Sequence, residues 1–209
     1  MFTGIIEEIG VVSAVSFNGE SGTVRVKAHR VLEDSKVGDS ICTDGICLTI
    51  TSLSSAYFDA DFMSETYRRT KIQGMRAGCK VNLERALAFN GRLGGHLVSG
   101  HIDGIGTVTG KEVSTNSVIF KISIEERLMK FVSEKGSVAV DGVSLTVSET
   151  GEGFFKVAVI PHTQFQTTLL GLETGDKVNI ETDLIAKYID TLIKHEKGSL
   201  AYADLVNLL

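Results

Sequence analysis

The sequence predicts an all-β protein in which two homologous barrel or sandwich domains are followed by one amphipathic helix. An internal repeat divides the chain into two similar halves. Glycine occurs 22 times and proline once, and short runs of Val, Ile and Thr end at Asp-Gly or Asn-Gly pairs, as is typical of β-rich domains with tight turns. Only the last segment has extended helical periodicity, so helix is expected to be the minor component.

The repeat is clearest around its Asp-Gly pair, where residues 40–49 read SICTDGICLT and residues 137–146 read SVAVDGVSLT. The same offset between the copies aligns residues 78–84 with 175–181, and an offset one residue shorter aligns residues 4–10 with 100–106. We therefore predict two homologous domains, at residues 1–90 and 96–187, and a C-terminal helical segment at residues 184–209.

Each repeat carries a predicted hairpin at its Asp-Gly pair, because such a two-residue turn needs positive φ, which Asp and Gly tolerate. After the turn, side chains alternate between the two faces of a strand. Cys47 and Thr49 therefore share one face of the first copy, and Ser144 and Thr146 share the equivalent face of the second. This polar strip is either a solvated sheet face or a binding surface. Composition alone favours the solvated face, and the recurrence of the strip and its cysteine weaken that interpretation.

Helical segments are expected at three places. Short helix starts follow a strand pattern in each repeat, at Ser64-Glu65-Thr66 and at Pro161-His162-Thr163. After the second repeat, Asp183 precedes an apolar stripe that has no counterpart in the first repeat: Ile185, Tyr188, Ile189, Leu192 and Ile193. Such a stripe has to be covered, either by other copies of the chain or by folding back as a lid on the second domain.

Composition and charge exclude several classes of protein. With 43% hydrophobic and 22% charged residues the chain is neither disordered nor a coiled coil. A net charge of −5 gives no electrostatic footprint for nucleic acid or an anionic membrane. The sequence begins MFTGIIEE, with acids where a signal peptide would carry lysines, and it has no run of 18 apolar residues, so we expect neither secretion nor membrane insertion. Three cysteines without a C-x-x-C pair fit free thiols in the cytoplasm.

Two histidines lie in a glycine-rich segment where the second repeat begins, GGHLVSGH at residues 94–101. On a regular strand His96 and His101 would face opposite ways, and no cysteine or acid lies at ligand spacing, so we expect no metal site. The glycines permit close approach of the backbone to a ligand, or they form a plain linker. Dinucleotide, P-loop and nucleophile-elbow motifs are absent, which argues against an NAD enzyme or an NTPase.

These motifs together resemble the two-barrel riboflavin synthase family, and the resemblance covers essentially the whole chain. The matching segments are MFTGI (1–5), DGICLT (44–49), GGHLVSGHIDG (94–104), the segment from Glu134 to DGVSLTV (141–147), IPHT (160–163) and VNIETDLIAKY (178–188). Where many members have Asn before the Gly of the first turn, this chain has Asp44, an equally good turn former.

The resemblance implies two six-stranded Greek-key barrels in each subunit of a homotrimer. It also implies dismutation of two molecules of 6,7-dimethyl-8-ribityllumazine, in which a four-carbon unit passes between them to give riboflavin and 5-amino-6-(ribitylamino)uracil. No cofactor or metal is implied. One lumazine would bind in each barrel, with the reaction between the N-barrel of one subunit and the C-barrel of the next. Association with a lumazine synthase shell stays open.

Site residues follow from the resemblance position by position. The expected catalytic residues are Phe2, Ser40, Cys47, His101, Ser144, Thr146 and Asp183. The substrate-binding residues expected in the N-barrel are Gly4, Ile5, Ile6, Cys47, Leu48, Thr49, Asp61, Phe62, Met63, Ser64, Glu65 and Thr66. Those expected in the C-barrel are Gly100, His101, Ile102, Lys135, Ser144, Leu145, Thr146, Ala158, Val159, Ile160, Pro161, His162 and Thr163.

The expected roles are a nucleophile or polarised water near Cys47 or Ser40, proton transfer by His101, and orientation of this network by Asp183. From the residues alone, Cys47 is a buried thiol, Ser40 is a turn hydroxyl and Asp183 is a helix N-cap. Two other functions stay open: a lumazine or flavin carrier without catalysis, and a flavin-dependent reductase, for which the chain lacks a nucleotide-binding domain.

Overall fold

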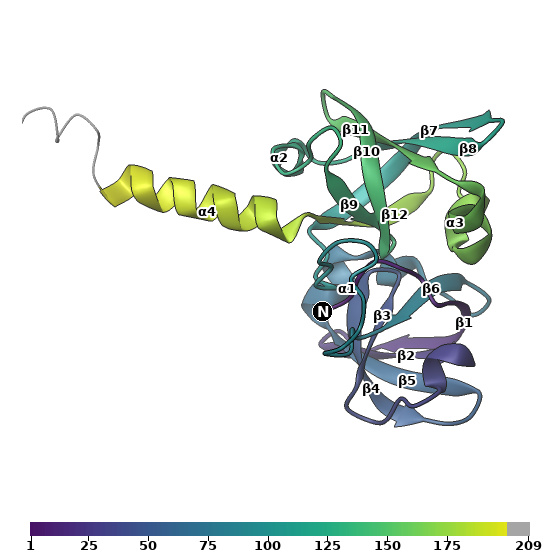
Figure 1. Ribbon diagram of the computed structural model, residues 1–209. Coiled ribbons are helices and arrows are strands. Elements are labelled where there is room, and N and C mark those ends of the chain that lie inside the picture. The colour runs from purple at the N-terminus through teal and green to yellow at the C-terminus, as the bar shows by residue number, and fades with distance from the viewer. Residues whose placement is uncertain (200–209) are drawn as a thin grey trace, which may run out of the picture.

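The chain forms two closed six-stranded antiparallel barrels that pack against each other, and one long helix projects away from them (Figure 1). The computed structural model describes residues 1–199, with side chains up to residue 195. The predicted all-β architecture of two Greek-key barrels and a C-terminal helix is confirmed. Residues 200–209 of the predicted helical segment lie outside the described residues.

In the first barrel the strands neighbour one another in the order β1-β2-β5-β4-β3-β6, and β6 pairs with β1 to close the ring. The six strands are β1 (Glu8–Phe17), β2 (Ser21–Lys27), β3 (Ser40–Thr43), β4 (Ile46–Leu53), β5 (Tyr57–Met63) and β6 (Lys80–Arg85). Three short helical elements connect them: η1 (Arg30–Leu32), α1 (Ser64–Arg69) and η2 (Lys71–Gly74).

The second barrel repeats this topology as β7-β8-β11-β10-β9-β12, closed by the pairing of β12 with β7. Its strands are β7 (Gly104–Ser114), β8 (Ser117–Ser123), β9 (Ser137–Val140), β10 (Val143–Gly151), β11 (Phe154–Val159) and β12 (Lys177–Thr182). The helical elements of this half are α2 (Glu126–Met129), α3 (Pro161–Gln166), η3 (Thr168–Gly171) and α4 (Leu184–Ser199).

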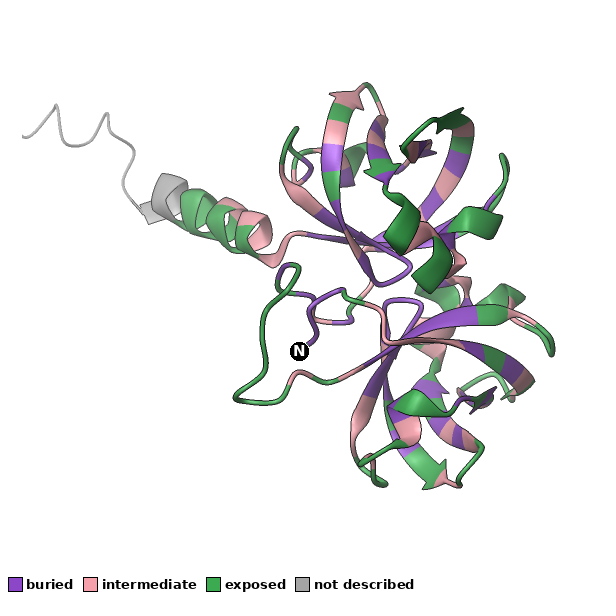
Figure 2. Cartoon of the chain, turned by 45° about the vertical axis from the view of Figure 1, so that its right-hand side comes forward, coloured by how far each residue is buried: buried purple, intermediate pink, exposed green. Residues whose placement is uncertain are grey.

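The predicted hairpins form at both Asp-Gly pairs. Asp44 and Gly45 have φ of 46° and 84°, and Asp141 and Gly142 have φ of 47° and 78°. Positive φ at both central residues is the geometry of the two-residue turns that suit twisted hairpins. The alternation that follows is also as predicted: odd and even positions of β4 and β10 alternate between buried and more exposed (Figure 2).

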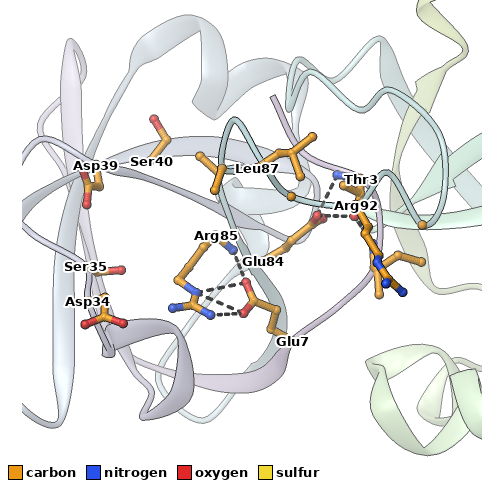
Figure 3. Close-up of a pocket in the computed structure, with 15 residues that line it drawn as sticks. Thr3, Glu7, Asp34, Ser35, Asp39, Ser40, Glu84, Arg85, Leu87 and Arg92 are labelled. Atoms are coloured by element: carbon orange, nitrogen blue, oxygen red, sulfur yellow. Dashed lines mark hydrogen bonds and ion pairs between the residues drawn. The ribbon is translucent and has the colours of Figure 1, made fainter.

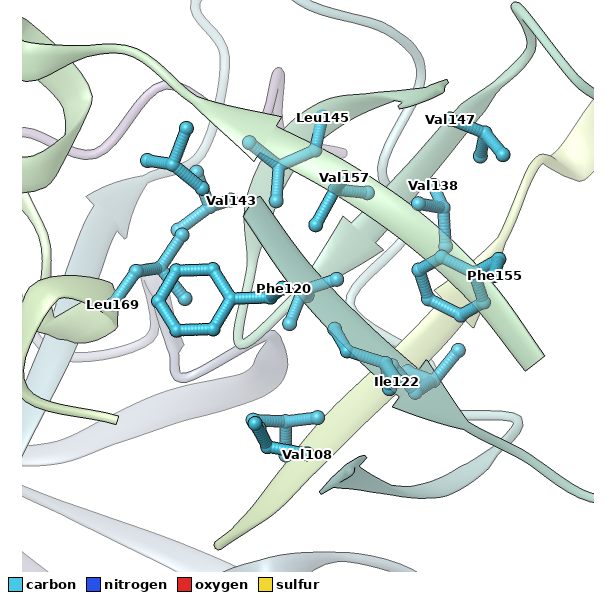
Figure 4. Packing of buried hydrophobic residues seen from close by; sticks show 14 of the residues in the cluster. Val108, Phe120, Ile122, Val138, Val143, Leu145, Val147, Phe155, Val157 and Leu169 are labelled. Atoms are coloured by element: carbon cyan, nitrogen blue, oxygen red, sulfur yellow. The ribbon is translucent and has the colours of Figure 1, made fainter. Parts of the chain in front are cut away.

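Each barrel has its own hydrophobic core, because the inward-facing residues of its six strands close around one centre. The second core contains Phe120 and Phe155, both fully buried, surrounded by aliphatic side chains (Figure 4). The first core is built in the same way around Phe58. A small third cluster lies apart from both and contains Phe2 and Val98, each 0% exposed.

The barrels meet at the tips of their two hairpins, which are related by an approximate twofold axis. Gly45 and Gly142 approach so closely that a Cβ on Gly45 would lie 2.9 Å from the backbone nitrogen of Gly142. Buried amides join the turns crosswise: Asn82 Nδ2 donates to Asp141 O at 3.0 Å, and Asn179 Nδ2 donates to Asp44 O at 2.8 Å. Each amide therefore satisfies a turn carbonyl of the other repeat.

One lysine breaks this symmetry. Lys71 Nζ lies 2.9 Å from Asp44 Oδ2 and 2.6 Å from Asp141 Oδ2, whereas the repeat places Thr168 at the equivalent position. Burial tends to lower the pKa of Lys71, but the two carboxylates outweigh it and raise the pKa. Burial, opposed by Lys71 and assisted by Asp44, raises the pKa of Asp141 to about 7. The Lys71 ammonium therefore forms ion pairs with both buried carboxylates.

We expect Asp44→Asn to stabilise the protein at pH 8. Asp141 has an ordinary pKa of 3.8 and a native pKa of about 7, so the native state binds the extra proton and stability falls as the pH rises between these values. Removing the second carboxylate should raise the free energy of unfolding at pH 8, because the Asp44 charge that adds to the burial effect on Asp141 is lost while Lys71 stays paired with Asp141. Urea unfolding at pH 5 and pH 8 measures both the fall in wild-type stability with pH and the stabilisation by Asp44→Asn.

The matched variant Lys71→Thr copies the residue of the second repeat. At pH 8 it leaves two buried carboxylates without a cation, which should cost about 3–5 kcal/mol. At pH 5 the loss of stability should be smaller, because Asp141 is already protonated. Adding Asp44→Asn to Lys71→Thr should restore much of the stability that is lost at pH 8. An equal loss at both pH values, or an Asp44→Asn variant less stable than the wild type at pH 8, would contradict this account.

Candidate functional sites

Two extended segments, one at the start of each repeat, cross between the barrels. We call residues 2–6 the first strap and residues 98–102 the second strap. They pair with each other antiparallel: Phe2 N donates to Val98 O at 2.7 Å and Val98 N donates to Phe2 O at 3.1 Å. Phe2 is wholly buried in this contact, so the structure gives it a packing role between the straps and the two barrels.

Each strap lies against the barrel of the other repeat. Gly4 O accepts a hydrogen bond from Ser144 N at 2.8 Å, and Gly100 O accepts one from Cys47 N at 2.8 Å. Ile6 packs on the second core and Ile102 on the first. The prediction grouped residues 4–6 with the first barrel and residues 100–102 with the second. In the structure Gly4 and Ile6 also contact the second barrel, and Gly100 and Ile102 also contact the first, because local sequence similarity does not say which barrel a strap covers.

The Cys47 site is a cleft of about 420 Å³ on the first barrel. It lies between the first barrel and the second strap, and its lining includes predicted residues from both sets: Cys47, Met63, Glu65, Thr66, Gly100, His101 and Ile102. Ile46, Arg69 and Thr70 also line it and were not among the predicted residues. Cys47 is half-buried beside the strap, and His101 is exposed. The cleft thus combines a thiol, hydroxyl groups and an imidazole with apolar side chains.

Other residues predicted for this site lie around the cleft or behind it. Thr49 and Asp61 are exposed partners on β4 and β5, and Asp61 accepts a hydrogen bond from Thr23 at 2.8 Å. Ser64 begins α1. Leu48 and Phe62 point into the first core, each 3% exposed. Their side chains therefore pack inside the barrel, away from its outer face.

The Ser144 site on the second barrel contains a residue that the predicted set omitted. His96 Nδ1 lies 2.7 Å from Ser144 Oγ, and the buried Nε2 has no hydrogen-bond partner among the residues that the structure describes. Burial lowers the pKa of His96, and the negative charge of Asp183 opposes the shift. A neutral imidazole next to a hydroxyl can accept its proton. The glycine-flanked position of His96 was the available signal.

The remaining residues predicted for the second barrel surround Ser144 unevenly. Gly4 of the first strap, which was predicted for the first barrel, approaches it, since a Cβ on Gly4 would lie 2.6 Å from Ser144 Cβ. Ile5 instead lines a cavity of the first barrel together with Ser40. Exposed or half-buried positions on β10, β11, α3 and the junction between β11 and α3 continue the outer face: Thr146, Ala158, Ile160, Pro161, His162 and Thr163. Lys135 is exposed in the turn before β9 with φ of 65°. Leu145 and Val159 belong to the core.

Two predicted catalytic residues lie outside both groups. Ser40 begins β3 opposite Thr49 and lines a separate cavity of about 730 Å³, where Nε and Nη2 of Arg85 both donate to Glu7 Oε2 (Figure 3). Asp183 Oδ1 accepts a hydrogen bond from Ile185 N at 2.9 Å, the contact of a residue that caps α4. Asp183 is also close enough to His96 to affect its charge.

Within the described residues, no three His, Cys, Asp or Glu side chains are placed to hold a metal ion. In the same part of the chain, no helix has both the length and the apolar character needed to cross a membrane. Cys42, Cys47 and Cys79 are all free thiols. Burial raises the pKa of Cys42 well above its usual value, so this thiol stays protonated, whereas Cys47 lines a cleft.

Two barrels of one topology, each with a polar outer strip covered at its edge by a strap, define a duplicated ligand-binding protein. The family model of the Lumazine binding domain matches residues 3–86 and again residues 99–183. The chain is 46% identical to the riboflavin synthase of Actinobacillus pleuropneumoniae, covering 92% of this chain and 90% of that protein. It therefore belongs to the riboflavin synthase family, as its motifs predicted.

Further comparisons agree with this membership. Identity to the riboflavin synthase of Bacillus subtilis (strain 168) is 44%, over 90% of this chain and 88% of that protein. The crystal structure of LumP complexed with riboflavin superposes with a TM-score of 0.81 at 25% identity, covering 87% of this chain and 99% of that one. The two barrels and their mutual arrangement are thus shared with LumP.

We expect His96 to protonate at a lower pH than an ordinary histidine, whose pKa is about 6.5. Asp183→Asn should lower the pKa further, because it removes the carboxylate that opposes the burial effect and keeps an N-cap side chain. Histidine side-chain NMR across pH 4–8 measures the titration. A His96 pKa above the ordinary value, or one that Asp183→Asn leaves unchanged, would refute this electrostatic description.

Proposed function

We propose that the chain dismutates 6,7-dimethyl-8-ribityllumazine: one molecule gives a four-carbon unit to a second, yielding riboflavin and 5-amino-6-(ribitylamino)uracil. The observation that carries this proposal is the duplication of the site. Cys47 and Ser144 occupy equivalent strand positions, and each backbone N–H donates to a strap carbonyl of the other repeat. A reaction whose donor and acceptor are the same compound needs two similar pockets, which a duplicated barrel supplies.

Alignment of the two lumazines would supply most of the rate. Holding two reactants in an attack geometry contributes roughly 7–11 kcal/mol to lowering a barrier. The sites must also differ, because one lumazine gives and the other takes. The Cys47 site offers a thiol beside His101, and the Ser144 site offers a hydroxyl bonded to His96. We assign nucleophilic or water-polarising assistance to Cys47 and proton transfer to the histidines.

Helix α4 supports a proposed homotrimer in which the Cys47 site of one subunit meets the Ser144 site of the next. Polar residues attach α4 to its own barrel: Lys187 Nζ lies 2.8 Å from Asp103 Oδ2, and Lys130 Nζ lies 2.9 Å from Asp190 Oδ2. The apolar stripe is exposed, with Tyr188 at 63%, and the helix projects from the barrels (Figure 2). This orientation disfavours a lid on the chain's own barrel and favours packing between copies.

A non-catalytic carrier of lumazine or flavin is the second candidate. The observation that favours it is the similarity to LumP, whose structure was determined with riboflavin bound. The two candidates differ in turnover and not in binding, so binding alone does not discriminate between them. The hydroxyl–imidazole pair at Ser144 favours the enzyme, because a carrier has no need of a buried proton acceptor.

The deciding experiment is to incubate the pure protein with 6,7-dimethyl-8-ribityllumazine alone and to follow both products. We expect one riboflavin for every two lumazines consumed, no requirement for an added nucleotide, and no inhibition by EDTA. Tight binding of lumazine without turnover would favour the carrier. Strict dependence on an added metal or nucleotide would exclude the proposed reaction.

Two cysteine variants provide a matched control within that experiment. Cys47→Ser should lower turnover by about 10²–10⁴-fold while changing lumazine affinity much less, since acid–base or nucleophilic assistance acts in the transition state. Cys79→Ser, which changes a thiol outside both sites, should leave turnover unchanged. Wild-type turnover in Cys47→Ser would remove this thiol from the chemistry.

The proposed role of α4 in assembly predicts the effect of charges on its stripe. Ile189→Glu combined with Leu192→Glu, at positions 51% and 65% exposed, should give monomers that bind lumazine but turn over poorly, with specific activity rising at high protein concentration. Light scattering and activity at several concentrations measure both. A trimer of normal activity in the double variant would show that α4 does not assemble the subunits.

A further inference from the structure

Glu84 on β6 is a buried carboxylate that binds the first strap with both oxygens. Its Oε1 accepts hydrogen bonds from Thr3 N and Thr3 Oγ1, both at 2.7 Å, and its Oε2 accepts one from Gly4 N at 2.9 Å. The side chain is almost completely buried, with 4% of the residue exposed. Burial raises its pKa, and the three donated hydrogen bonds oppose this shift.

Glu181 on β12 repeats the arrangement on the second strap. Its Oε1 accepts from Ser99 N at 2.7 Å and from Ser99 Oγ at 2.6 Å, and its Oε2 accepts from Gly100 N at 2.9 Å. Glu181 is 1% exposed. The hydrogen bonds to charged oxygens in both copies are of the stronger kind, and a buried carboxylate without them would be costly.

Each strap is bound by a glutamate of one barrel but ends beside the functional site of the other barrel. Glu84 belongs to the first barrel, but the strap it binds presents Gly4 O to Ser144 N of the second barrel. Glu181 belongs to the second barrel, and its strap presents Gly100 O to Cys47 N of the first. At Gly100 the fit is tight, since a Cβ there would lie 2.5 Å from Cys47 Cβ. Each strap is thus fixed by one barrel and forms the wall of the site on the other.

We propose that Glu84 and Glu181 are crossed positioning residues for the two lumazine sites: Glu84 sets the geometry of the Ser144 site, and Glu181 sets that of the Cys47 site. This inference rests on the proposed function for the identity of the ligand, and on the hydrogen bonds alone for the crossing. Neither glutamate contacts substrate. Each acts through the strap backbone, and a positional error of about 1 Å in such a wall is enough to impair binding and alignment.

The test uses Glu84→Gln and Glu181→Gln in the full-length protein. Glutamine keeps the volume and can still accept from the first strap residue, but its NH₂ faces the N–H of Gly4 or Gly100, so one hydrogen bond is lost. Lumazine is titrated while the backbone amide signals of Cys47 and Ser144 are followed by ¹⁵N NMR. Protection of the Cys47 thiol from alkylation, in a Cys79→Ser background, gives an independent value for the Cys47 site.

We expect Glu84→Gln to weaken lumazine binding at the Ser144 site about tenfold and to leave the Cys47 site within about twofold; Glu181→Gln should do the opposite. Leu83→Ala and Ile180→Ala are matched controls, because each opens a cavity in the barrel that carries the glutamate. Neither should produce the crossed pattern. Weakening on the same barrel as the substitution, equal weakening at both sites, or no weakening at either would overturn the proposal.

Hydrogen exchange in the ligand-free protein separates this proposal from the proposed function. Glu84→Gln should accelerate exchange of the Ser144 amide relative to that of Cys47, and Glu181→Gln should do the reverse. If the protein binds no lumazine, the function fails while the crossed exchange pattern still supports the positioning role. If exchange shows no crossed pattern, the positioning role fails whatever the ligand.

Discussion

The contact between the two Asp-Gly turns is the constraint on which the rest of the structure depends. Gly45 and Gly142 meet with no space for a Cβ, so only glycine permits this approach. The positive φ of all four central residues fixes the type of both turns. Bringing the turns together places the first strand after each turn beside the strap of the other repeat. The pairing of Cys47 with Gly100, and of Ser144 with Gly4, follows from that approach.

The sequence was sufficient to predict the barrels, because strand patterning and turn chemistry act locally and recur in register. It also predicted which face of β4 and β10 carries polar groups, since side-chain alternation has a fixed period of two. It could not predict the crossing of residues 2–6 and 98–102. Whether a strap covers its own barrel or the other depends on contacts between residues far apart in the chain, such as Thr3 with Glu84. The one-residue change of register between strap and hairpin was the only hint that the straps pack as separate units.

The candidate sites were predicted unevenly for the same reason. Cys47, Thr66 and His101 do lie in one cleft, but His101 reaches it from the strap of the second repeat. His96 was left out of the predicted set because its importance comes from a contact with Ser144 Oγ, a residue 48 positions away. Phe2 and Leu48 are buried, and no pattern in the sequence separates a residue that supports a site from one that touches its ligand.

The pattern of differences between the repeats has a physical explanation. Positions that join the barrels are the same or nearly so in both copies: the Asp-Gly turns, Asn82 and Asn179, Glu84 and Glu181, Thr3 and Ser99. Each of these residues makes the same contact in both repeats, once on either side of the twofold axis. Lys71 cannot be used twice, because a second lysine at position 168 would have to reach the same two carboxylates that Lys71 already contacts at 2.9 and 2.6 Å. Two ammonium groups in that space would repel each other at short range in a medium of low dielectric constant. The two repeats therefore have to differ at this position on the axis. Cys47 and Ser144 lie away from the axis, where each repeat has room for its own side chain, so their difference reflects the chemistry of the two sites.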